Sequence, residues 1–446
     1  MIFSSTSFLL IFLLIALLIY HITPKNLKNV ILCFISISFY LLNDANMFLF
    51  LLLLIIITYL AMKYSDHKRK HLTIVIAFLV FILAYFKYYG QLLSHIPNVN
   101  TIIMPLGISF IVFSMISVIF DHHHNQQLKL DFFTYLNFIL FFPKLFMGPL
   151  MRYEDFQKQF HDHNKTYHFN EASIMLLKGC FYKVVLADTF SSLFVMLQGG
   201  NSTLNAWLIL ITYALQLYFD FYGYTCMALG IADLFGYQLP INFNHPYVAN
   251  SIQNFWTRWH ISLSTWFKDY VYIPLGGSRG SKKRTMLNLC IVWILTGLWH
   301  GSSLTYLFWG IYYACLLLIE KYLLHKYLKP IPNFIKIAST FLLVMIGWVF
   351  FFESNLINVF TFVLSLFNFK NISDSLSIGI WMQYQSFYII AYLLCTPLLS
   401  KVMMKLKQHM QQSYWILEAM ISISGWILVF MYLIASSYQA FLYFQF

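Results

Sequence analysis

Long apolar stretches separated by short polar segments make up most of the chain. Crossing a bilayer core takes about 20 helical residues, so some stretches are short for one crossing and others could hold two. They lack the alternation of a membrane β-strand, and in lipid a helix satisfies its own backbone polar groups. We therefore expect an all-α polytopic membrane protein with about 10 to 12 membrane helices. The stretches lie near residues 7–22, 29–42, 46–62, 71–89, 102–120, 132–151, 172–198, 204–236, 286–323, 337–352, 376–400 and 415–445.

One apolar stretch, Phe141–Arg152, contains helix breakers. Pro143, Gly148 and Pro149 all fall within it, and a proline removes a backbone donor and obstructs a helix. The pattern predicts a broken or re-entrant segment. Irregular backbone at membrane depth is tolerated only where protein buries it or where it lines a water-filled cavity, so we expect such segments around a central funnel.

Basic loops between the apolar stretches predict the orientation. Lys63–Lys70, Lys282–Arg284 and Lys401–Lys407 are the main basic segments, and loops rich in Lys and Arg stay in the cytoplasm. The uncharged turn Gln91–Asn100 and the N-terminus then fall outside. The first stretch, Ser7–Tyr20, has no basic segment before it and no small-residue cleavage site, so we expect a retained span rather than a signal peptide.

Composition supports the membrane class, because only 10% of the 446 residues are charged and 60% are hydrophobic. The net charge of +12 comes from loops between apolar spans, which does not predict nucleic-acid binding. The six cysteines include no Cys-x-x-Cys pair, which argues against disulfides and zinc. Without an internal repeat or a soluble segment, residues 1–446 are expected to form a single membrane domain.

Two histidines carry the candidate chemistry. His300 lies in the almost uncharged run Met286–Tyr322, and an ionisable residue at membrane depth is a functional-site hypothesis by default. An imidazole can donate, accept and carry a proton near neutral pH. His260 follows Arg258 within an aromatic segment. Each ring could instead be a core residue bonded to a neighbour, which for His260 would be Arg258 or a backbone carbonyl.

Other polar residues within or beside apolar stretches have two readings each. Asp220 lies among aromatic residues and could either serve the site or anchor two helices. The glycine-containing basic loop Gly276–Arg284 could contact phosphates or act only as a topology signal. Arg152 could touch substrate or extend to the headgroups. Asp121–His124 could bind a metal together with His161, His163 and His168, and a solvated loop is the alternative.

From Met1 to at least Glu320 the chain resembles the bacterial alginate O-acetylase branch of the membrane-bound O-acyltransferases. The most specific matching stretches are Phe142–Tyr153, Asn254–Gly277 and Gly297–Gly301. The D-alanyl-lipoteichoic acid transferases share the two-histidine layout, but their segment after the broken helix is less similar to Gly148–Tyr153. D-alanyl transfer to teichoic acid is therefore the second reading.

The resemblance implies transfer of acetyl from cytosolic acetyl-coenzyme A, with no bound cofactor, to hydroxyls of an extracytoplasmic polysaccharide such as alginate, peptidoglycan or cellulose. It also implies the bacterial cytoplasmic (inner) membrane and a periplasmic or extracellular acetyltransferase partner. The residue matching His300 is the catalytic one and that matching His260 a second site residue, and a buried neutral imidazole suits proton removal from a hydroxyl. Expected supporting or substrate-binding residues are Asp220, Asn254, Trp256, Arg258, Trp259, Lys268, Asp269, Trp299, Arg279 and Arg152.

The chain departs from the family pattern at two places. The segment after Asp220 lacks the second carboxylate that relatives carry. If that acid tunes or positions a group in relatives, Asp220 must act alone here, and the choice of substrate can differ. Tyr312 and Tyr313 stand where relatives often have a His-Gly pair. Two non-enzymatic alternatives are a transporter with His300 as a proton site, which inverted repeats would favour, and an export scaffold.

Overall fold

The structure is a computed structural model that describes residues 3–64, 69–93, 104–125, 128–162, 164–324, 327 and 329–435. Within these ranges the chain forms helices and no strand, which confirms the predicted all-α class. Residues 65–68 of the basic loop, 94–100 of the uncharged turn and His163 lie outside the described residues. The chain separates into two compact units, Met1–Leu176 with Tyr224–Ile241, and Leu177–Gly223 with Asn242–Phe446. The single domain over 1–446 stays a prediction.

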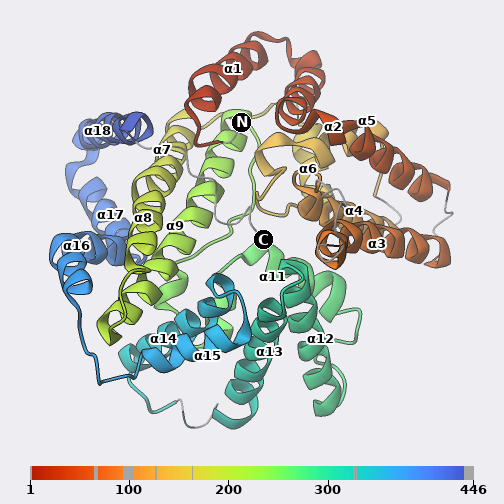
Figure 1. The fold of residues 1–446 in the computed structure, drawn as a ribbon. Helices are drawn as coiled ribbons and strands as arrows, with labels where there is room; N and C mark the ends of the chain where they lie inside the picture. Colours follow the sequence, from red (N-terminus) through yellow and green to blue (C-terminus); the bar gives the residue numbers. More distant parts are fainter. Residues whose placement is uncertain are drawn as a thin grey trace. The chain divides into compact units, whose positions relative to one another are not determined.

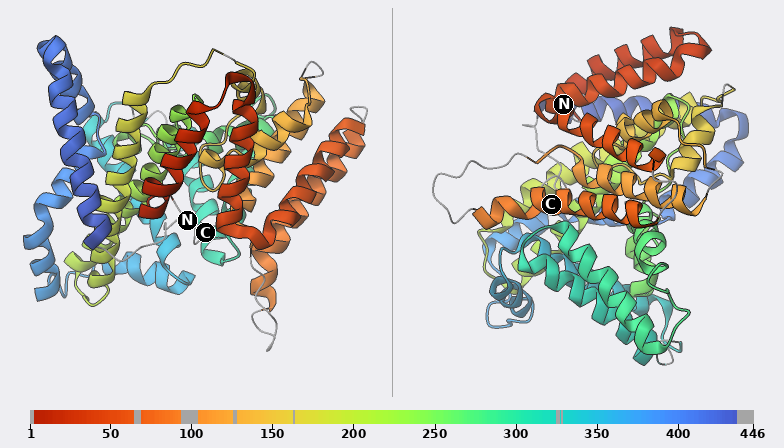
Figure 2. Two further views of the ribbon diagram at one scale, coloured as in Figure 1. Left: turned by 90° about the horizontal axis from the view of Figure 1, so that it is seen from above. Right: turned by 90° about the vertical axis from the view of Figure 1, so that its right-hand side faces the viewer.

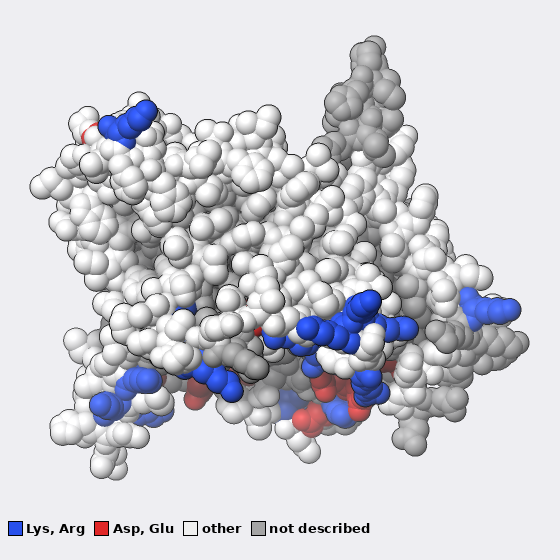
Figure 3. Space-filling view, turned by 90° about the horizontal axis from the view of Figure 1, so that it is seen from below, with Lys and Arg blue, Asp and Glu red and all other residues white. Residues whose placement is uncertain are grey.

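Seven segments among the described residues are long and apolar enough to cross a membrane, and three shorter apolar helices accompany them. Two of the seven, Lys25–Tyr64 and Leu398–Ala435, span 40 and 38 residues, roughly twice the length of one crossing. They are interrupted at Asp44 and Gln411, where the backbone leaves helical geometry. Figure 3 shows wide areas without charged side chains, as lipid contact requires. The other five segments of membrane-crossing length are Lys70–Tyr89, Phe169–Leu197, Thr203–Leu234, Leu304–Leu324 and Asn333–Phe352.

The first unit contains the predicted broken segment. Helix α5 ends at Leu140, and the chain continues through a short 3-10 turn, Phe142–Lys144, and non-helical backbone before α6 begins. Phe141–Pro149 is buried. A Cβ on Gly148 would lie 2.3 Å from the Lys144 Cα, so this bend needs glycine. The unit comprises α1 (Leu13–Ile22), α2 (Lys28–Tyr64), α3 (Arg69–Leu93), α4 (Ile108–His124), α5 (Phe132–Leu140), α6 (Tyr153–Phe160) and parts of α7 (Phe169–Cys180) and α9 (Thr203–Leu234).

The second unit holds the remaining helices. The π-helical turn Phe181–Ala187 joins α7 to α8, and α18 packs against this turn (Figure 2). The helices are α8 (Asp188–Leu197), most of α9, α10 (Ile252–Trp256), α11 (Ile261–Phe267), α12 (Lys282–His300), α13 (Leu304–Ile319), α14 (Asn333–Phe352), α15 (Leu356–Ser365), α16 (Ser375–Leu394), α17 (Leu398–Met410) and α18 (Tyr414–Ala435).

Helices α12 and α13 lie side by side (Figure 1). A Cβ on Gly297 would lie 2.5 Å from the Tyr306 carbonyl oxygen, and one on Gly310 would lie 2.3 Å from the Trp293 carbonyl oxygen. Small residues let membrane helices approach closely. These two glycines therefore set the distance between α12 and α13, and with it the position of His300 at the end of α12.

Serine side chains begin the helices around this pair. Ser251, Ser281 and Ser303 each precede a helix and accept a hydrogen bond from a backbone N–H of its first turn. Such a cap satisfies a donor that the helix itself leaves without a partner. The starts of α10, α12 and α13 are thus encoded locally in the sequence.

Candidate active site

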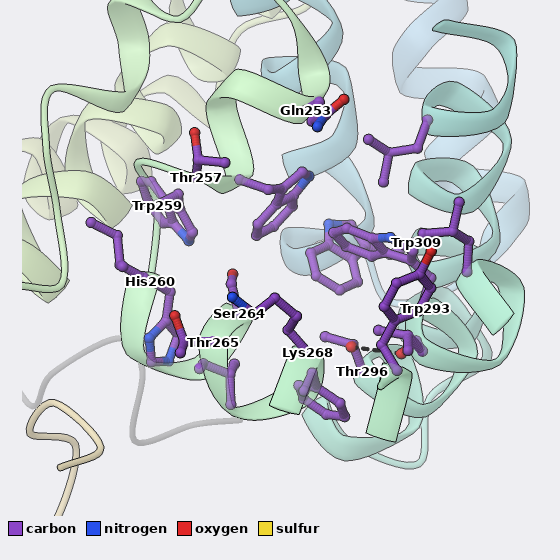
Figure 4. Close-up of a pocket in the computed structure, with 18 of the residues that line it drawn as sticks. Gln253, Thr257, Trp259, His260, Ser264, Thr265, Lys268, Trp293, Thr296 and Trp309 are labelled. Carbon is purple, nitrogen blue, oxygen red and sulfur yellow. Dashed lines mark hydrogen bonds between the residues drawn. The ribbon is translucent and has the colours of Figure 1, made fainter. Parts of the chain in front are cut away.

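His260 and His300 line one cavity of about 480 Å³ within the second unit. Aromatic side chains form a large part of its wall. In Figure 4, Trp259 and His260 lie on one side of the cavity, and Trp293 and Trp309 lie opposite. The described lining residues include the tryptophans Trp256, Trp259, Trp293, Trp309 and Trp348, together with Phe351.

A strained, closed loop positions His260. Its backbone has a φ of 45°, in the left-handed region that non-glycine residues rarely adopt. The Asn244 N–H donates to the Arg258 carbonyl at 3.0 Å, and the Ile261 N–H donates to the Asn242 carbonyl at 3.0 Å. These two bonds hold the ends of the loop together. Such backbone strain persists only where the surrounding structure fixes it, as at many active sites.

The buried Asn242 side chain fixes the tautomer of His260. Asn242 Oδ1 accepts hydrogen bonds from the Ser262 backbone N–H at 3.0 Å and from Ser262 Oγ at 2.9 Å. Because an N–H can only donate, the atom facing Ser262 must be the amide oxygen. His260 Nδ1 lies 3.2 Å from the same oxygen, so Nδ1 carries the proton. The neutral ring then has Nε2 as its acceptor nitrogen.

Burial keeps the His260 ring neutral. The residue is 3% exposed, and burial lowers the pKa of His260 to about 3. Phe221 packs edge-on against the imidazole with ring centroids 4.6 Å apart. An apolar neighbour offers a cationic ring little compensation for lost water. His260 can therefore act as an acceptor or orient a hydroxyl without becoming charged.

His300 ends α12 inside an aromatic cage and is 6% exposed. The imidazole centroid lies 4.9 Å from that of Trp309 and 5.0 Å from that of Phe351, both in edge-on arrangements. Trp299 lies 4.7 Å away, so this predicted residue flanks His300 although it is not among the cavity-lining residues. A water-poor surrounding strengthens hydrogen bonds and charge interactions during a reaction.

One part of the cavity wall is polar and basic. Lys268 and Lys321 both line it, together with Tyr272 and Ser278, whose hydroxyl groups lie 2.7 Å apart. Lys268 was expected at the site, whereas Lys321 was not. The sequence signal for Lys321 is its place at the end of an apolar run, where it also reads as an ordinary cytoplasmic flank.

Two basic side chains of the loop Gly276–Arg284 make contacts with the protein itself. Arg284 Nε and Nη2 donate to the Leu275 carbonyl at 3.3 and 3.2 Å. The Lys282 ammonium lies 4.6 Å above the Tyr322 ring. Arg279 is in this loop and is not among the residues that line the cavity. The loop thus borders the polar wall mainly through Ser278.

A second carboxylate lies near Asp220, although the segment after Asp220 supplies none. Lys183 Nζ lies 2.8 Å from Asp220 Oδ1 and 2.8 Å from Asp188 Oδ1. Asp220 and Lys183 are each 2% exposed. A second carboxylate is therefore present, but it comes from α8 rather than from the segment after Asp220. The π-helical turn presents Lys183, and such turns occur frequently at functional sites.

The other predicted site residues divide between the cavity and its surroundings. Trp256, Trp259 and Lys268 line the cavity. Arg258 Nη1 donates to the Asn244 carbonyl at 3.4 Å and so supports the His260 loop. Asn254 lies in α10, and its carbonyl accepts from Thr257 Oγ1 at 2.8 Å. Asp269, 3.9 Å from Lys268, is also outside the cavity lining, and Arg152 lies in the first unit beside α6.

Tyr312 and Tyr313, the second departure from the family pattern, have structural roles. The Tyr312 hydroxyl donates to the Leu343 carbonyl at 2.8 Å and so joins α13 to α14. Tyr313 is fully buried, and its ring centroid lies 4.8 Å from that of Trp256. Tyr312 therefore joins two helices, and Tyr313 packs against a tryptophan of the cavity wall.

The described residues bring no three His, Cys, Asp or Glu side chains together as metal ligands. His124 Nδ1 lies 2.9 Å from the Phe120 carbonyl oxygen, and His161 Nε2 lies 3.4 Å from Thr134 Oγ1. These two histidines of the possible metal cluster therefore have ordinary local partners.

Comparison with known proteins identifies similar sequences over most of the chain. Residues 30–358 match the sequence profile of the membrane-bound O-acyltransferase family. The probable alginate O-acetylase AlgI of Pseudomonas syringae pv. tomato is 36% identical over 382 residues, which cover 80% of this chain and 73% of that protein.

Two further relatives bear different names. The peptidoglycan O-acetyltransferase of Helicobacter pylori is 32% identical over 411 residues, covering 80% of this chain and 78% of that protein. The teichoic acid D-alanyltransferase of Bacillus subtilis is 32% identical over 286 residues, covering only 58% of this chain and 70% of that protein. Similarity to the O-acetyltransferases thus extends over more of the chain.

Proposed function

Because the chain belongs to the membrane-bound O-acyltransferase family, we propose that its aromatic cavity carries out acetyl transfer from acetyl-coenzyme A to a hydroxyl on the outer side of the cytoplasmic membrane. The chain is a multi-pass membrane protein of an enzyme family. The non-enzymatic alternatives, a transporter and an export scaffold, are therefore not favoured. D-alanyl transfer is not favoured, since that relative matches less of the chain.

His300 is the proposed catalytic base. It takes the proton from the attacking hydroxyl as the oxygen bonds to the acetyl carbon. The carbon–sulfur bond then breaks, and the departing thiolate receives the proton from the imidazolium. The aromatic cage supports this role because it excludes water that would hydrolyse the thioester.

His260 is proposed to orient the acceptor hydroxyl or the thioester carbonyl during the reaction. Its bond to Asn242 fixes the ring and its tautomer, which is the usual way that an indirect partner prepares a reactive histidine. The ring stays neutral because burial lowers the pKa of His260 to about 3. His260 therefore serves as an uncharged partner while His300 moves the proton.

The donor is proposed to enter at the wall that carries Lys268 and Lys321. Ammonium groups suit phosphate oxygens, and both lysines line the cavity. A cavity of about 480 Å³ suits the acetylated arm of the donor, with the nucleotide phosphates kept at the lysines. Lys321 follows α13 on the side of the basic loops, which is the cytoplasmic side by the charge rule.

The acceptor is proposed to be an extracytoplasmic polysaccharide, reached directly or through a periplasmic or extracellular acetyltransferase partner. Two relatives are named for acetylation of alginate and of peptidoglycan, and both polymers carry sugar hydroxyls outside the membrane. A bacterial cytoplasmic membrane is the location at which a cytosolic donor and such an acceptor are both accessible.

The shared cavity of His260 and His300 carries this proposal, and replacement of His300 tests it. His300→Ala should abolish O-acetylation of the cell-surface glycan and transfer from radiolabelled acetyl-coenzyme A in membrane vesicles. Protein level and membrane insertion should stay unchanged. His409→Ala, at an exposed position on α17, is the control. Normal acetylation by the His300→Ala protein would refute the proposal.

A further inference from the structure

A second cavity, of about 430 Å³, is lined by the segment after α8, the first residues of α9, the end of α14 and one side of α15. Its wall differs in chemistry from the tryptophan-lined cavity. Most of the described lining residues carry a side-chain amide, a hydroxyl or a carboxylate, although apolar atoms form the larger part of the exposed wall. The polar residues include Asn201, Ser202, Asn205, Glu353, Asn358 and Ser365.

Helix direction places this cavity at the outer end of the second unit. Helix α12 begins at the basic residues Lys282–Arg284 and α14 begins near Lys336, whereas Glu353 follows the far end of α14. Asp374 precedes α16 at the same end, since its Oδ2 accepts from the Ser202 N–H at 3.2 Å. Helix α16 then leads to the basic helix α17. By the charge rule, the polar cavity faces the extracytoplasmic side.

Two consecutive residues of α14 separate the two cavities. Phe351 lines the catalytic cavity and packs against His300 with centroids 5.0 Å apart. Phe352 lines the polar cavity and packs edge-on against Phe362 with centroids 5.0 Å apart. The end of α14 thus contributes one residue to each cavity, and the polar cavity lies on the side from which the acceptor is proposed to arrive.

The polar wall suits a sugar. Amide and hydroxyl groups can both donate and accept, as neighbouring sugar hydroxyls require. Asn205 is 2% exposed, and its Oδ1 has no hydrogen-bond partner among the described residues, although its Nδ2 donates to the Leu197 carbonyl at 2.9 Å. A buried acceptor of this kind gains from a ligand donor. Phe352 and Phe362 offer a surface for the apolar face of a sugar ring.

The charge of the lining residues favours neutral sugars over acidic ones. Glu353 is the only charged residue among the described residues that line the cavity, and no Lys or Arg is among them. Lys370 follows α15 but is not a lining residue. A uronate would bring its carboxylate toward Glu353 without a compensating cation, and like charges repel. Hydroxyl and acetamido groups meet no such cost.

We propose that this cavity binds a neutral, hydroxyl-bearing sugar unit of the acceptor glycan in preference to a uronate. The inference rests on the proposed function, because it names the acceptor class for the same reaction. Of the two polymers considered above, it favours one that contains N-acetylhexosamine over a polyuronate.

Binding to the full-length protein in lipid nanodiscs, without donor, tests the preference. The probes are a neutral N-acetylglucosamine tetrasaccharide and a mannuronate tetrasaccharide. The neutral probe should bind about tenfold more tightly. Glu353→Gln should narrow that difference by improving uronate binding. Equal affinity, or tighter binding of the uronate by the unmodified protein, would overturn the proposal.

A pair of variants at one exposed position tests the location. Thr361 lines the cavity and is exposed on α15, so its substitution leaves the core intact. Thr361→Trp should fill the cavity and weaken neutral-probe binding at least tenfold, whereas Thr361→Ala should leave it within about twofold. Unchanged binding by the Trp variant would place the sugar elsewhere and refute the assignment.

His300→Ala separates this inference from the proposed function. The variant should still bind the neutral probe, since His300 is not part of the polar cavity. If it loses acetyl transfer while even the unmodified protein binds no sugar, the reaction assignment stands and the acceptor site is wrong. If the unmodified protein binds the neutral probe but transfers no acetyl group, the site stands and the reaction assignment is wrong.

Discussion

Lys183 and Asp220 form a buried ion pair across two apolar helical segments, with Nζ and Oδ1 2.8 Å apart. The same ammonium lies 2.8 Å from Asp188. Phe221, next to Asp220, packs on the His260 ring. The charged group is thus linked to the second site histidine through one residue of α9, although neither Lys183 nor Asp220 lines the cavity.

Lys183→Met should destabilise the protein by about 3 to 5 kcal/mol, because it leaves two carboxylates buried without their cation. Thermal unfolding of the purified protein in detergent measures the loss. Adding Asp220→Asn to this variant should recover part of the stability, since one buried charge is removed. A double variant no more stable than Lys183→Met alone would contradict the ion-pair account.

Asn242→Ala should lower the turnover rate by about 10- to 100-fold, because His260 loses the group that fixes its tautomer. The Michaelis constant for acetyl-coenzyme A should change much less. Asn29→Ala, whose side chain is half-buried and outside the cavity lining, is the control. A rise in the Michaelis constant at unchanged turnover would show that Asn242 acts in donor binding instead.

Gly310→Ala should force α12 and α13 apart, since the added carbon would lie 2.3 Å from the Trp293 carbonyl oxygen. Overpacking of this kind costs about 1 to 3 kcal/mol, and displacement of His300 should reduce acetyl transfer. Gly379→Ala on α16 is the control, because nothing lies within 4 Å of its added carbon. Equal activity and stability of both variants would exclude the close-approach role.

Stability should depend on pH through His260. The folded pKa of about 3 lies below the ordinary value of 6.5, so protons bind preferentially to the unfolded chain. The contribution of the neutral His260 ring to the free energy of unfolding is complete above the unfolded pKa, and it is lost as the pH falls toward the folded pKa. Between about pH 8 and about pH 5 the loss should be about 2 kcal/mol. His260→Asn should show a correspondingly flatter dependence in thermal unfolding, and parallel curves would contradict this burial effect.

Lys321→Gln should raise the Michaelis constant for acetyl-coenzyme A roughly fivefold, because an exposed charge contact contributes about 1 kcal/mol. Turnover at saturating donor should remain near that of the unmodified enzyme. The effect should shrink as salt is added, since salt screens exposed charges. Lys405→Gln, exposed on α17, serves as the control. A salt-independent loss of turnover would argue against a donor-binding role for Lys321.

The sequence predicted the features that follow from local chemistry. The length of the apolar stretches predicted the helical membrane class, and Pro143, Gly148 and Pro149 predicted the broken segment. His260 and His300 were both expected at the site, and the structure brings them to one cavity, whereas their catalytic roles stay predictions. The matching aromatic residues Trp256 and Trp259 could be expected there for the same reason.

The sequence did not predict the partners that packing brings together. Lys183 lies in an apolar stretch and was not among the predicted site residues, and its pairing with Asp188 and Asp220 depends on how the π-helical turn faces α9. Asn242 was not predicted either, and its contact with His260 joins residues 18 positions apart in the chain. Such contacts depend on tertiary geometry, which hydrophobic periodicity does not encode.

Phe351 and Phe352 are neighbours in the chain, so one segment of α14 lines both the catalytic cavity and the polar cavity. Consecutive helical side chains point about 100° apart, so a ligand that shifts the α14 backbone at Phe352 also shifts Phe351. A sugar that shifts this segment on binding in the polar cavity would then move Phe351, which packs against His300.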